Sequence, residues 1–526
     1  CVVYEFRGIP MMAPDILTVQ TATSVMGNYT FKLTFEQYSV ILVCMAFFFT
    51  FLRLHEVKVT EKRVFHIAGF IVVALGCGLF TNQIILSDFM EEHQINIRMF
   101  RPMESYQKYG GVLTFARSVG YAVVKKPEGY TTAKVDQIIQ EYEKKSANEQ
   151  QSTAKQYPNI ITVVNETFAE IKVLGDFKTN EDYMPYFHSL KKNCVTGYTY
   201  ASIVGGQTAN TEFELLTGNT LGFLSAGTTA FQLYIHGQMP SLVSNLKAEG
   251  YSGNKAMHPF NPYNYNRPAV YKDFGFTDFI DKFDFPKNVK RVREYISDEA
   301  NVDRIISEYE KNRKKTDQPF YMYNMTIQNH SPYDKDAANF KQPIKIESSK
   351  YDAEANRYLN LIKYSDDSLK QLTSYFEKCK EPTIILFLGD HQPRLTDEFM
   401  NKITNGQYQT WSSEQMLKRF QVPFVIWANY DIKEQHIEKT SMNNIQSILT
   451  KTAGVKMTGY QRFLNEVRKE VPTITSQGYW GKNGKFYQIN DKGSPYYGII
   501  QKYRMIQYNM MFDKKNRRDS FFEVSK

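Results

Sequence analysis

Cysteine is scarce in this chain, which has 5 among 526 residues. Cys44 and Cys77 lie in apolar segments, and Cys194 and Cys379 are the only thiols after residue 88. Small secreted domains that depend on disulfide bonds use cysteine far more densely. The scarcity excludes a disulfide-rich scaffold, while a single bond between Cys194 and Cys379 stays open.

The sequence also lacks a repeat of fixed period, a long low-complexity tract and any nucleic-acid-binding motif. Residues 456–526 mix aromatic and basic side chains, as in GYWGKNGKFYQINDKG, but this mixture without a motif does not indicate nucleic acid. We expect no nucleic-acid partner. We interpret residues 456–526 as a small C-terminal appendage of short strands and turns that packs on the main domain.

Size and charge allow a large protein that works near a membrane. A chain of 526 residues with 42% hydrophobic residues can build two or more domains with a substantial core. The formal net charge of +9 suits a position beside anionic lipid, although many soluble proteins are equally basic.

Two apolar segments near the start predict transmembrane helices over residues 33–54 and 64–87. The first contains an uncharged run over residues 37–52, and in the second His66 is the only residue that can carry a charge. About 20 apolar residues suffice to span a bilayer. A buried core helix is the alternative for the first segment.

The loop between these segments is basic, with positive charges at Arg53, Lys58, Lys62 and Arg63. By the positive-inside rule, this loop is cytoplasmic and everything after residue 88 is outside. The chain opens with Cys1 rather than Met, so we expect residues 1–87 to be a membrane region that lacks its beginning. A lipidated mature cysteine is the alternative.

We interpret residues 88–156 as a helical juxtamembrane linker, because Val135, Ile138 and Tyr142 recur at helical spacing. The main, extracellular domain then covers residues 157–455. There, apolar runs that end in polar residues, such as ITVVNETF and TIILFLGDH, alternate with helical stretches. Ser297 is the predicted N-cap of one of these helices.

Strands that alternate with helices indicate an α/β fold with a mainly parallel sheet and helices on both faces. Ligands gather at the carboxyl ends of the strands in such sheets. These ends carry Glu166, His330, Asp390 and His391.

Thr208 lies between a glycine turn and the start of a predicted helix, in GGQTANTEFELLTGN. Free N–H groups and the positive dipole end at a helix start favour an anionic phosphate, and a metal would favour the alkoxide form of the hydroxyl. Thr208 is therefore a candidate nucleophile and metal ligand. The alternative is that Thr208 only caps the helix, with Glu212 in its first turn.

We predict a divalent-metal site whose ligands are Thr208, Glu166, Asp390 and His391. Adjacent residues of an extended strand point to opposite faces, so Asp390 and His391 share a metal only if the chain turns, which Gly389 allows. Three oxygen donors and one imidazole suit Mn²⁺ or Mg²⁺, with Zn²⁺ as a third option. Such a site indicates metal-assisted transfer at phosphorus or sulfur. The alternative is that Asp390 and His391 merely cap a helix.

Several blocks in a fixed order resemble the lipoteichoic acid synthases and phosphoglycerol transferases, a membrane-anchored branch of the alkaline phosphatase and sulfatase superfamily. The blocks are FRGIPMMAPDIL, ITVVNETF, GGQTANTEFELLTGN, YNYNRPAVYKDFGF, MTIQNHSPY, FLGDHQP and VPFVIWANYDI. The resemblance implies a sulfatase-like fold, further membrane helices before residue 1, and an external catalytic domain on a multi-pass membrane anchor.

The resemblance also assigns substrate-binding residues. His330 in QNHSPY matches the family's active-site histidine, an acid or base near the phosphoryl group. Arg267 in NYNRPAVY matches its phosphate-contacting arginine. Tyr265 stands where some members have tryptophan, which leaves stacking on a glycerol unit open. Ala209-Asn210-Thr211 replaces the Ser-Asp-Ala of well-known synthases, which points to a different acceptor.

The implied function is transfer of glycerophosphate from phosphatidylglycerol to a glycolipid or polyglycerolphosphate acceptor, through an ester on Thr208. The alternatives are a metal-dependent phosphodiesterase or phosphatase, a phosphoethanolamine transferase, and a non-catalytic surface protein. Phosphoethanolamine transferases usually carry several disulfides, which counts against them here. No cysteine begins the C-x-P-x-R sequence of the formylglycine sulfatases.

Overall fold

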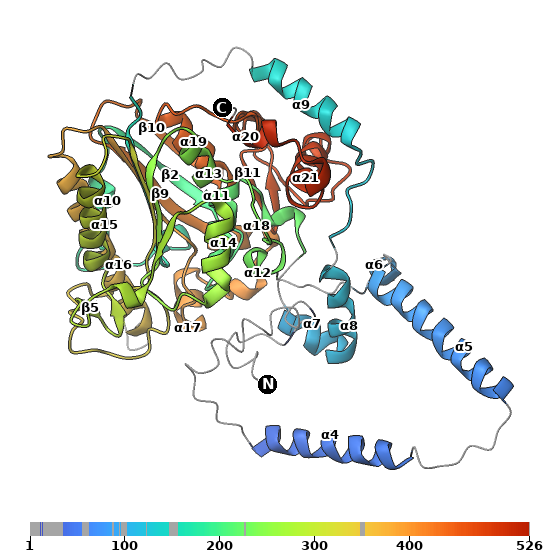
Figure 1. Cartoon of the computed structure of the whole chain (residues 1–526). Helices are drawn as coiled ribbons and strands as arrows, with labels where there is room; N and C mark the ends of the chain where they lie inside the picture. Colours follow the sequence, from blue (N-terminus) through green and yellow to red (C-terminus); the bar gives the residue numbers. More distant parts are fainter. Residues whose placement is uncertain are drawn as a thin grey trace. The chain divides into compact units, whose positions relative to one another are not determined.

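The computed structural model describes residues 11, 13, 35–54, 63–86, 89–93, 95, 102–122, 124–146, 156–225, 228–347 and 353–524. The chain divides into two compact units (Figure 1). The first contains residues 1–125 and 225–228, and the second contains residues 126–224 and 229–526.

The first unit is helical in its described residues. One stretch of these residues, Ala68–Ile85, is long and apolar enough to cross a membrane, with a mean hydropathy of 1.8 and no buried residue. The other predicted span coincides with α4 and stays a prediction, while Lys58 and Lys62 of the basic loop lie outside the described residues. The helices are α4 (Phe35–Leu54), α5 (Arg63–Phe80), a π-helix (Thr81–Leu86), α6 (Phe89–Glu92), α7 (Pro102–Tyr109) and α8 (Gly111–Ala122).

An eight-stranded sheet forms the centre of the second unit, in the order β10-β2-β9-β8-β1-β7-β3-β4. Its central strands β1, β7 and β8 are buried along their whole length, as their apolar sequences require. The predicted α/β fold is confirmed, but the sheet is mixed, because β9 runs antiparallel to β2 and β8. The strands are β1 (Asn159–Asn165), β2 (Cys194–Tyr200), β3 (Ser252–Met257), β4 (Asp278–Ile280), β7 (Phe320–Met325), β8 (Thr383–Gly389), β9 (Gln421–Ala428) and β10 (Gln435–Ser441), with a separate hairpin of β5 (Arg291–Val292) and β6 (Tyr295–Ile296).

Helices cover both faces of this sheet: α10, α15 and α16 lie on one side, and α11, α13, α14 and α19 on the other (Figure 1). Ser297 caps α15 as predicted, since its hydroxyl accepts a hydrogen bond from the Ala300 N–H at 3.1 Å. The helices are α10 (Pro185–Ser189), α11 (Thr208–Thr217), α12 (Ala230–Leu233), α13 (Leu242–Ala248), α14 (Arg267–Phe274), α15 (Asp298–Arg313), α16 (Ala353–Phe376), α17 (Asp397–Ile403), α18 (Ser413–Met416) and α19 (Met442–Thr452).

The C-terminal segment contains more helix than the sequence analysis predicted. The helix α9 (Thr132–Ser146) packs against α20 and α21 of this segment and buries Val135, Ile138 and Tyr142, the apolar face that their spacing predicted. The segment consists of α20 (Gly459–Glu470), α21 (Tyr497–Met511), α22 (Asp519–Phe522) and the antiparallel strands β11 (Thr473–Thr475), β12 (Gly478–Trp480) and β13 (Phe486–Tyr487).

Side chains of the same C-terminal segment form hydrogen bonds with the backbone at the end of α11. Gly218 ends this helix in the left-handed conformation, and its carbonyl accepts hydrogen bonds from the hydroxyls of Tyr460 at 2.9 Å and Tyr503 at 2.6 Å. Gln507 bonds to both the N–H and the carbonyl of Thr220, at 2.8 and 2.9 Å. These bonds satisfy backbone groups that a buried helix end would otherwise leave without partners.

Candidate active site

Two strand ends bring three ligand side chains together. The strands β1 and β8 are parallel neighbours with Asn165 opposite Gly389, so Glu166 and Asp390 leave the sheet at the same level. Ligand atoms of Glu166, Asp390 and His391 lie within 4.8 Å of one another, and all three residues are buried. The His391 Nε2 is 3.2 Å from Asp390 Oδ2 and 3.9 Å from Glu166 Oε1.

A glycine is required where β8 ends. A Cβ atom at Gly389 would lie 1.8 Å from the carbonyl oxygen of Phe168 and 3.3 Å from the Cβ of Val422. The chain after β1 therefore approaches β8 more closely than any side chain allows. This close approach is what places Glu166 beside Asp390.

Two of the buried ligand atoms have no hydrogen-bond partner among the described residues, Asp390 Oδ2 and His391 Nε2. Asp390 uses its other oxygen, Oδ1, to accept from the N–H groups of Thr167 and His391 at 2.7 and 2.8 Å. The Nδ1 of His391 donates to the carbonyl of Gln392 at 3.0 Å, which leaves a lone pair on Nε2. Burial and the charge of Asp390 raise the pKa of Glu166 well above its usual value. A divalent cation fits this cluster, because it would bond to both atoms that lack partners.

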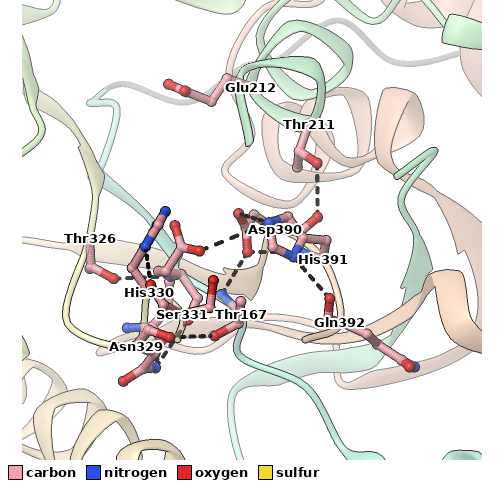
Figure 2. Close-up of polar contacts among 12 residues, drawn as sticks. Thr167, Thr211, Glu212, Thr326, Asn329, His330, Ser331, Asp390, His391 and Gln392 are labelled. Atoms are coloured by element: carbon pink, nitrogen blue, oxygen red, sulfur yellow. Dashed lines mark hydrogen bonds and ion pairs between the residues drawn. The ribbon is translucent and has the colours of Figure 1, made fainter. Parts of the chain in front are cut away.

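The chain after β7 supports these ligands (Figure 2). The Thr326 hydroxyl accepts a hydrogen bond from the Glu166 N–H at 3.0 Å. The side-chain amide of Asn329 donates to the Glu166 carbonyl at 3.0 Å and to Asn165 Oδ1 at 3.1 Å. Hydrogen bonds of this kind orient metal ligands before the metal binds.

Thr208 is the first residue of α11 and is 7% exposed. The alternative that Thr208 caps the helix is wrong, because Gln207 is the N-cap residue. Gln207 has a φ of 65° and forms no side-chain cap hydrogen bond. A residue other than glycine in this conformation is strained, and such strain clusters at functional sites.

Two hydrogen bonds connect the segment around Thr208 to the loop that carries the candidate metal ligands Asp390 and His391. The Thr211 hydroxyl donates to the Asp390 carbonyl at 2.8 Å, as Figure 2 shows, and the Gly205 N–H donates to the Gln392 carbonyl at 2.9 Å. Thr208 lies between these two anchors. Residues three apart share one helix face, so Thr208 starts the face of α11 that meets Asp390.

His330 lies five residues after the end of β7, in a loop that Arg293 holds. The Nδ1 of His330 donates to the carbonyl of Ser331 at 2.7 Å, and burial lowers the pKa of this imidazole below its usual value. The guanidinium of Arg293 donates to three carbonyls of the loop, those of Gln328, His330 and Pro332, at 2.7 to 2.9 Å. Arg293 was not predicted from the sequence, because the two-residue strands on either side of it leave no pattern to detect.

Arg267 is fully buried, and its predicted substrate role stays a prediction. Its Nε and Nη2 both donate to one oxygen of Glu212, at 3.0 and 2.7 Å, and the Tyr323 hydroxyl donates to the other oxygen at 3.1 Å. The Tyr265 ring lies 5.1 Å from the guanidinium carbon. Sequence analysis placed Glu212 only in the first turn of a helix, because a pair 55 residues apart has no local signal.

Cys194 and Cys379 do not form a disulfide bond. Cys194 is buried and Cys379 is half-buried, and both are free thiols. The second unit therefore depends on packing and hydrogen bonds rather than on a bond between these residues.

A family model described as Sulfatase matches residues 158–455, more than half of the chain. The chain belongs to the sulfatase family. The resemblance to the alkaline phosphatase and sulfatase superfamily, and to its lipoteichoic acid synthase branch, is confirmed. Members of this superfamily use a divalent metal, and in this sulfatase-family protein the cluster of Glu166, Asp390 and His391 is the candidate site.

Two curated relatives show how far the similarity extends. The chain is 30% identical over 433 residues to a putative cyclic beta-1,2-glucan modification protein of Rhizobium meliloti, covering 81% of this chain and 65% of the relative. It is 23% identical over 374 residues to the lipoteichoic acid synthase of Staphylococcus saprophyticus, covering 68% of this chain and 55% of the relative. The chain thus spans less than two thirds of the length of these relatives.

Solved structures share the fold of this sulfatase-family chain. The Streptococcus pyogenes phosphoglycerol transferase GacH, in complex with sn-glycerol-1-phosphate, has a TM-score of 0.62 at 20% identity and covers 76% of this chain and 100% of its own. The lipoteichoic acid synthase LtaP from Listeria monocytogenes has a TM-score of 0.53 at 20% identity and covers 74% of this chain and 98% of its own. At these identities the likeness shows a common fold.

Proposed function

We propose that this chain is a membrane-anchored phosphoglycerol transferase that moves glycerophosphate from phosphatidylglycerol to an acceptor hydroxyl outside the cell. The acceptor is a glycolipid, a polyglycerolphosphate or a glucan. The observation that supports the proposal most is the position of Thr208, a helix-start hydroxyl anchored on both sides to the loop of Asp390 and His391.

Thr208 is the proposed nucleophile. Its Oγ1 forms a bond to phosphorus while the bond from phosphorus to the diacylglycerol oxygen breaks, and glycerophosphate stays esterified to Thr208. Diacylglycerol leaves into the bilayer after its oxygen takes a proton. An acceptor hydroxyl then loses its proton, attacks phosphorus and releases the Thr208 oxygen.

His330 is the proposed acid and base for these proton transfers. Its Nδ1 proton is held by the Ser331 carbonyl, so Nε2 is the atom that takes the proton lost by the Thr208 hydroxyl and gives it to the diacylglycerol oxygen. In the second step, Nε2 takes the proton of the acceptor and returns it to the Thr208 oxygen. Arg267 orients the phosphoryl group, and Tyr265 lies beside this guanidinium. Because Glu212 already binds Arg267, we expect Glu212 to fix the direction of the guanidinium.

Glu166, Asp390, His391 and the Thr208 oxygen would hold one divalent metal. When bound, Mn²⁺ or Mg²⁺ would favour the alkoxide form of the threonine and offset negative charge on the phosphoryl oxygens. The mixture of three oxygens and one imidazole supports Mn²⁺ or Mg²⁺ first and Zn²⁺ third.

The relatives support a phosphoglycerol donor and a carbohydrate-containing acceptor. Two of the similar proteins are named as a phosphoglycerol transferase and a lipoteichoic acid synthase, and a third as a modification protein of a cyclic glucan. The departure at Ala209-Asn210-Thr211 agrees with an acceptor that differs from that of the well-known synthases.

Incubation of the purified full chain with fluorescent phosphatidylglycerol and Mn²⁺ tests the proposal. We expect release of diacylglycerol, and a glycerophosphate adduct on the peptide that contains Thr208 in mass spectra. Release of free glycerophosphate with every acceptor would indicate a phosphodiesterase. Preference for phosphatidylethanolamine would indicate a phosphoethanolamine transferase, and no turnover would indicate a binding protein.

A further inference from the structure

Two large apolar side chains are exposed among the described residues of the second unit, one three residues after Phe260 and one next to Lys282, whose N–H donates to the Phe260 carbonyl. They are Tyr263, 57% exposed, and Phe283, 73% exposed. Single exposed apolar residues are common on protein surfaces. Here the position of the two rings is the informative feature, because Tyr263 lies four residues before Arg267 and Phe283 follows Lys282, whose ammonium lies near the Phe260 ring.

A series of ring contacts links Phe283 to His330. The ring of Phe260 stacks on the His330 ring, with centroids 6.2 Å apart and an angle of 22° between the planes. The Nζ of Lys282 lies 5.9 Å from the centre of the Phe260 ring and 5.0 Å from that of Phe283. The Lys282 N–H also donates to the Phe260 carbonyl at 3.3 Å. Lys282 is therefore near both the ring that stacks on His330 and the exposed ring of Phe283.

Both exposed rings stand on turns that hydrogen bonds fix. Phe283 is the middle residue of a 3₁₀ turn, in which Asp281 and Asp284 cap each other's backbone N–H groups. The Tyr263 N–H donates to the side chain of Asn261 at 3.1 Å. A turn whose backbone is already fixed loses little conformational freedom when a ligand packs on its side chains, which favours binding.

We propose that Tyr263 and Phe283 form a stacking platform for sugar rings of the acceptor. This assignment rests on the proposed transferase function and narrows its acceptor to a carbohydrate. The C–H face of a sugar ring packs on an aromatic face, and its hydroxyls bond to polar side chains nearby. The platform has such groups on both turns, including Asn264, Asn266 and Asp284.

Charge disfavours a lipid surface as the occupant of the platform. Asp281 and Asp284 flank Phe283, and an anionic lipid surface would repel their carboxylates. Surfaces that lie in the membrane interface also combine several apolar side chains with lysine or arginine. The platform has two rings with one lysine between Phe260 and Phe283, and uncharged sugar is the ligand that tolerates its carboxylates.

Matched substitutions in the full chain distinguish a sugar ring from a lipid surface as the ligand of the platform. Phe283→Tyr keeps an aromatic face, whereas Phe283→Leu keeps apolar area and loses that face; Tyr263→Phe and Tyr263→Leu form the second pair. With a neutral glucan oligosaccharide as acceptor, we expect each leucine variant to raise the KM for glucan about tenfold and each aromatic variant to leave it unchanged. The rate of diacylglycerol release without acceptor should be the same in all four variants.

A binding measurement separates this proposal from the proposed function. Saturation-transfer NMR of the oligosaccharide with the full chain, in the absence of donor, should show contact in the wild type and in the aromatic variants, and a clear loss in the leucine variants. If the NMR result is as expected but no glycerophosphate is transferred, the stacking platform is supported and the proposed transferase function is overturned. Equal glucan binding by wild type and leucine variants would overturn the platform. Loss of binding to phosphatidylglycerol vesicles in Phe283→Ala but not in Phe283→Leu, with an unchanged KM for glucan, would also overturn it in favour of a membrane contact.

Discussion

At the residue scale, the threonines of α11 differ in what their hydroxyls do. Thr211 donates to the carbonyl of Asp390, and Thr217 donates to the carbonyl of Phe213, one turn earlier. Thr208 has no hydroxyl hydrogen bond among the described residues and is 7% exposed. Structural roles account for the Thr211 and Thr217 hydroxyls, whereas the Thr208 hydroxyl has none among the described residues, as its proposed role as nucleophile requires.

We expect Thr208→Ala to lower turnover of phosphatidylglycerol by several orders of magnitude, because it removes the proposed nucleophile and one proposed metal ligand. The melting temperature of the metal-free protein should hardly change, since Gln207 rather than Thr208 is the N-cap residue of α11. His330→Ala should cost about 100-fold to 10,000-fold in kcat, as for an acid-base group. Release of diacylglycerol measures both effects, and Thr208→Ser is the control that keeps a hydroxyl. Substantial turnover by Thr208→Ala would contradict the mechanism.

Metal should stabilise the protein through Glu166, Asp390 and His391. At a Mn²⁺ concentration of about 100 times its dissociation constant, binding should add about 2.7 kcal/mol to the free energy of unfolding. Thermal melts after treatment with EDTA and after return of Mn²⁺ measure this difference. Asp390→Asn should abolish it, whereas Asp397→Asn, on α17, should keep it. An equal response of wild type and Asp390→Asn would show that the metal binds elsewhere.

At the element scale, the register of β1 and β8 brings the candidate metal ligands together, and the missing side chain of Gly389 allows this register. Gly389→Ala places a Cβ against the Phe168 carbonyl, so we expect a loss of about 1–3 kcal/mol or more in the free energy of unfolding. Metal affinity should fall as well, because the ends of the two strands must move apart. Urea unfolding and Mn²⁺ titration measure the two effects. Gly406→Ala is the matched control, since a Cβ there meets nothing within 4 Å.

The short helix α10 carries a pH-sensitive contact. His188 bonds to Glu170 at 2.9 Å and to Asp182 at 2.7 Å, and the hydrogen bond to Glu170 leads the interactions that raise the pKa of His188 to about 9. A pKa above that of the unfolded chain means that this stabilisation is complete below about pH 6.5 and is lost as the pH rises through about 9. Urea midpoints at pH 6 and pH 10 should differ less in His188→Gln than in the wild type. Equal pH dependence in both proteins would contradict this assignment.

Several elements were predictable because their signals are local. The spacing of Val135, Ile138 and Tyr142 predicts α9, and Ser297 predicts the start of α15. The ends of β1 and β8 were equally clear, because each buried run stops at a polar residue. A helical signal was also present in α20, where Tyr460, Phe463, Leu464 and Val467 are buried, but the Gly, Tyr and Lys-rich surroundings concealed it.

Other features could not be predicted, because they depend on contacts between distant residues. The apolar sequence of a buried strand does not depend on the direction in which the strand runs, so the sequence of β9 does not indicate that it is antiparallel to β8. The pairing of Arg267 with Glu212 joins two helices through the core. The three carbonyls that Arg293 binds belong to a loop 35 to 39 residues further along the chain.

At the scale of the whole molecule, the orientation across the membrane is testable in intact cells. In a background with all five cysteines replaced, a cysteine at Glu128, whose side chain is 84% exposed, should react with a membrane-impermeant maleimide. A cysteine at Lys58 should react only after the cells are opened, because the basic loop is predicted to be cytoplasmic. The opposite pattern would place the catalytic unit inside and exclude the proposed external enzyme.

The hydrogen bonds from the C-terminal segment to the end of α11 limit how far the protein can be truncated. A shortened protein that ends at residue 455, where the family match stops, would lose Tyr460, Tyr503 and Gln507 and leave the buried carbonyls of Gly218 and Thr220 without partners. It would also uncover the apolar face of α9. The end of the family match therefore differs from the end of the compact unit, and we expect a shortened protein that folds to run from about residue 126 to at least residue 524.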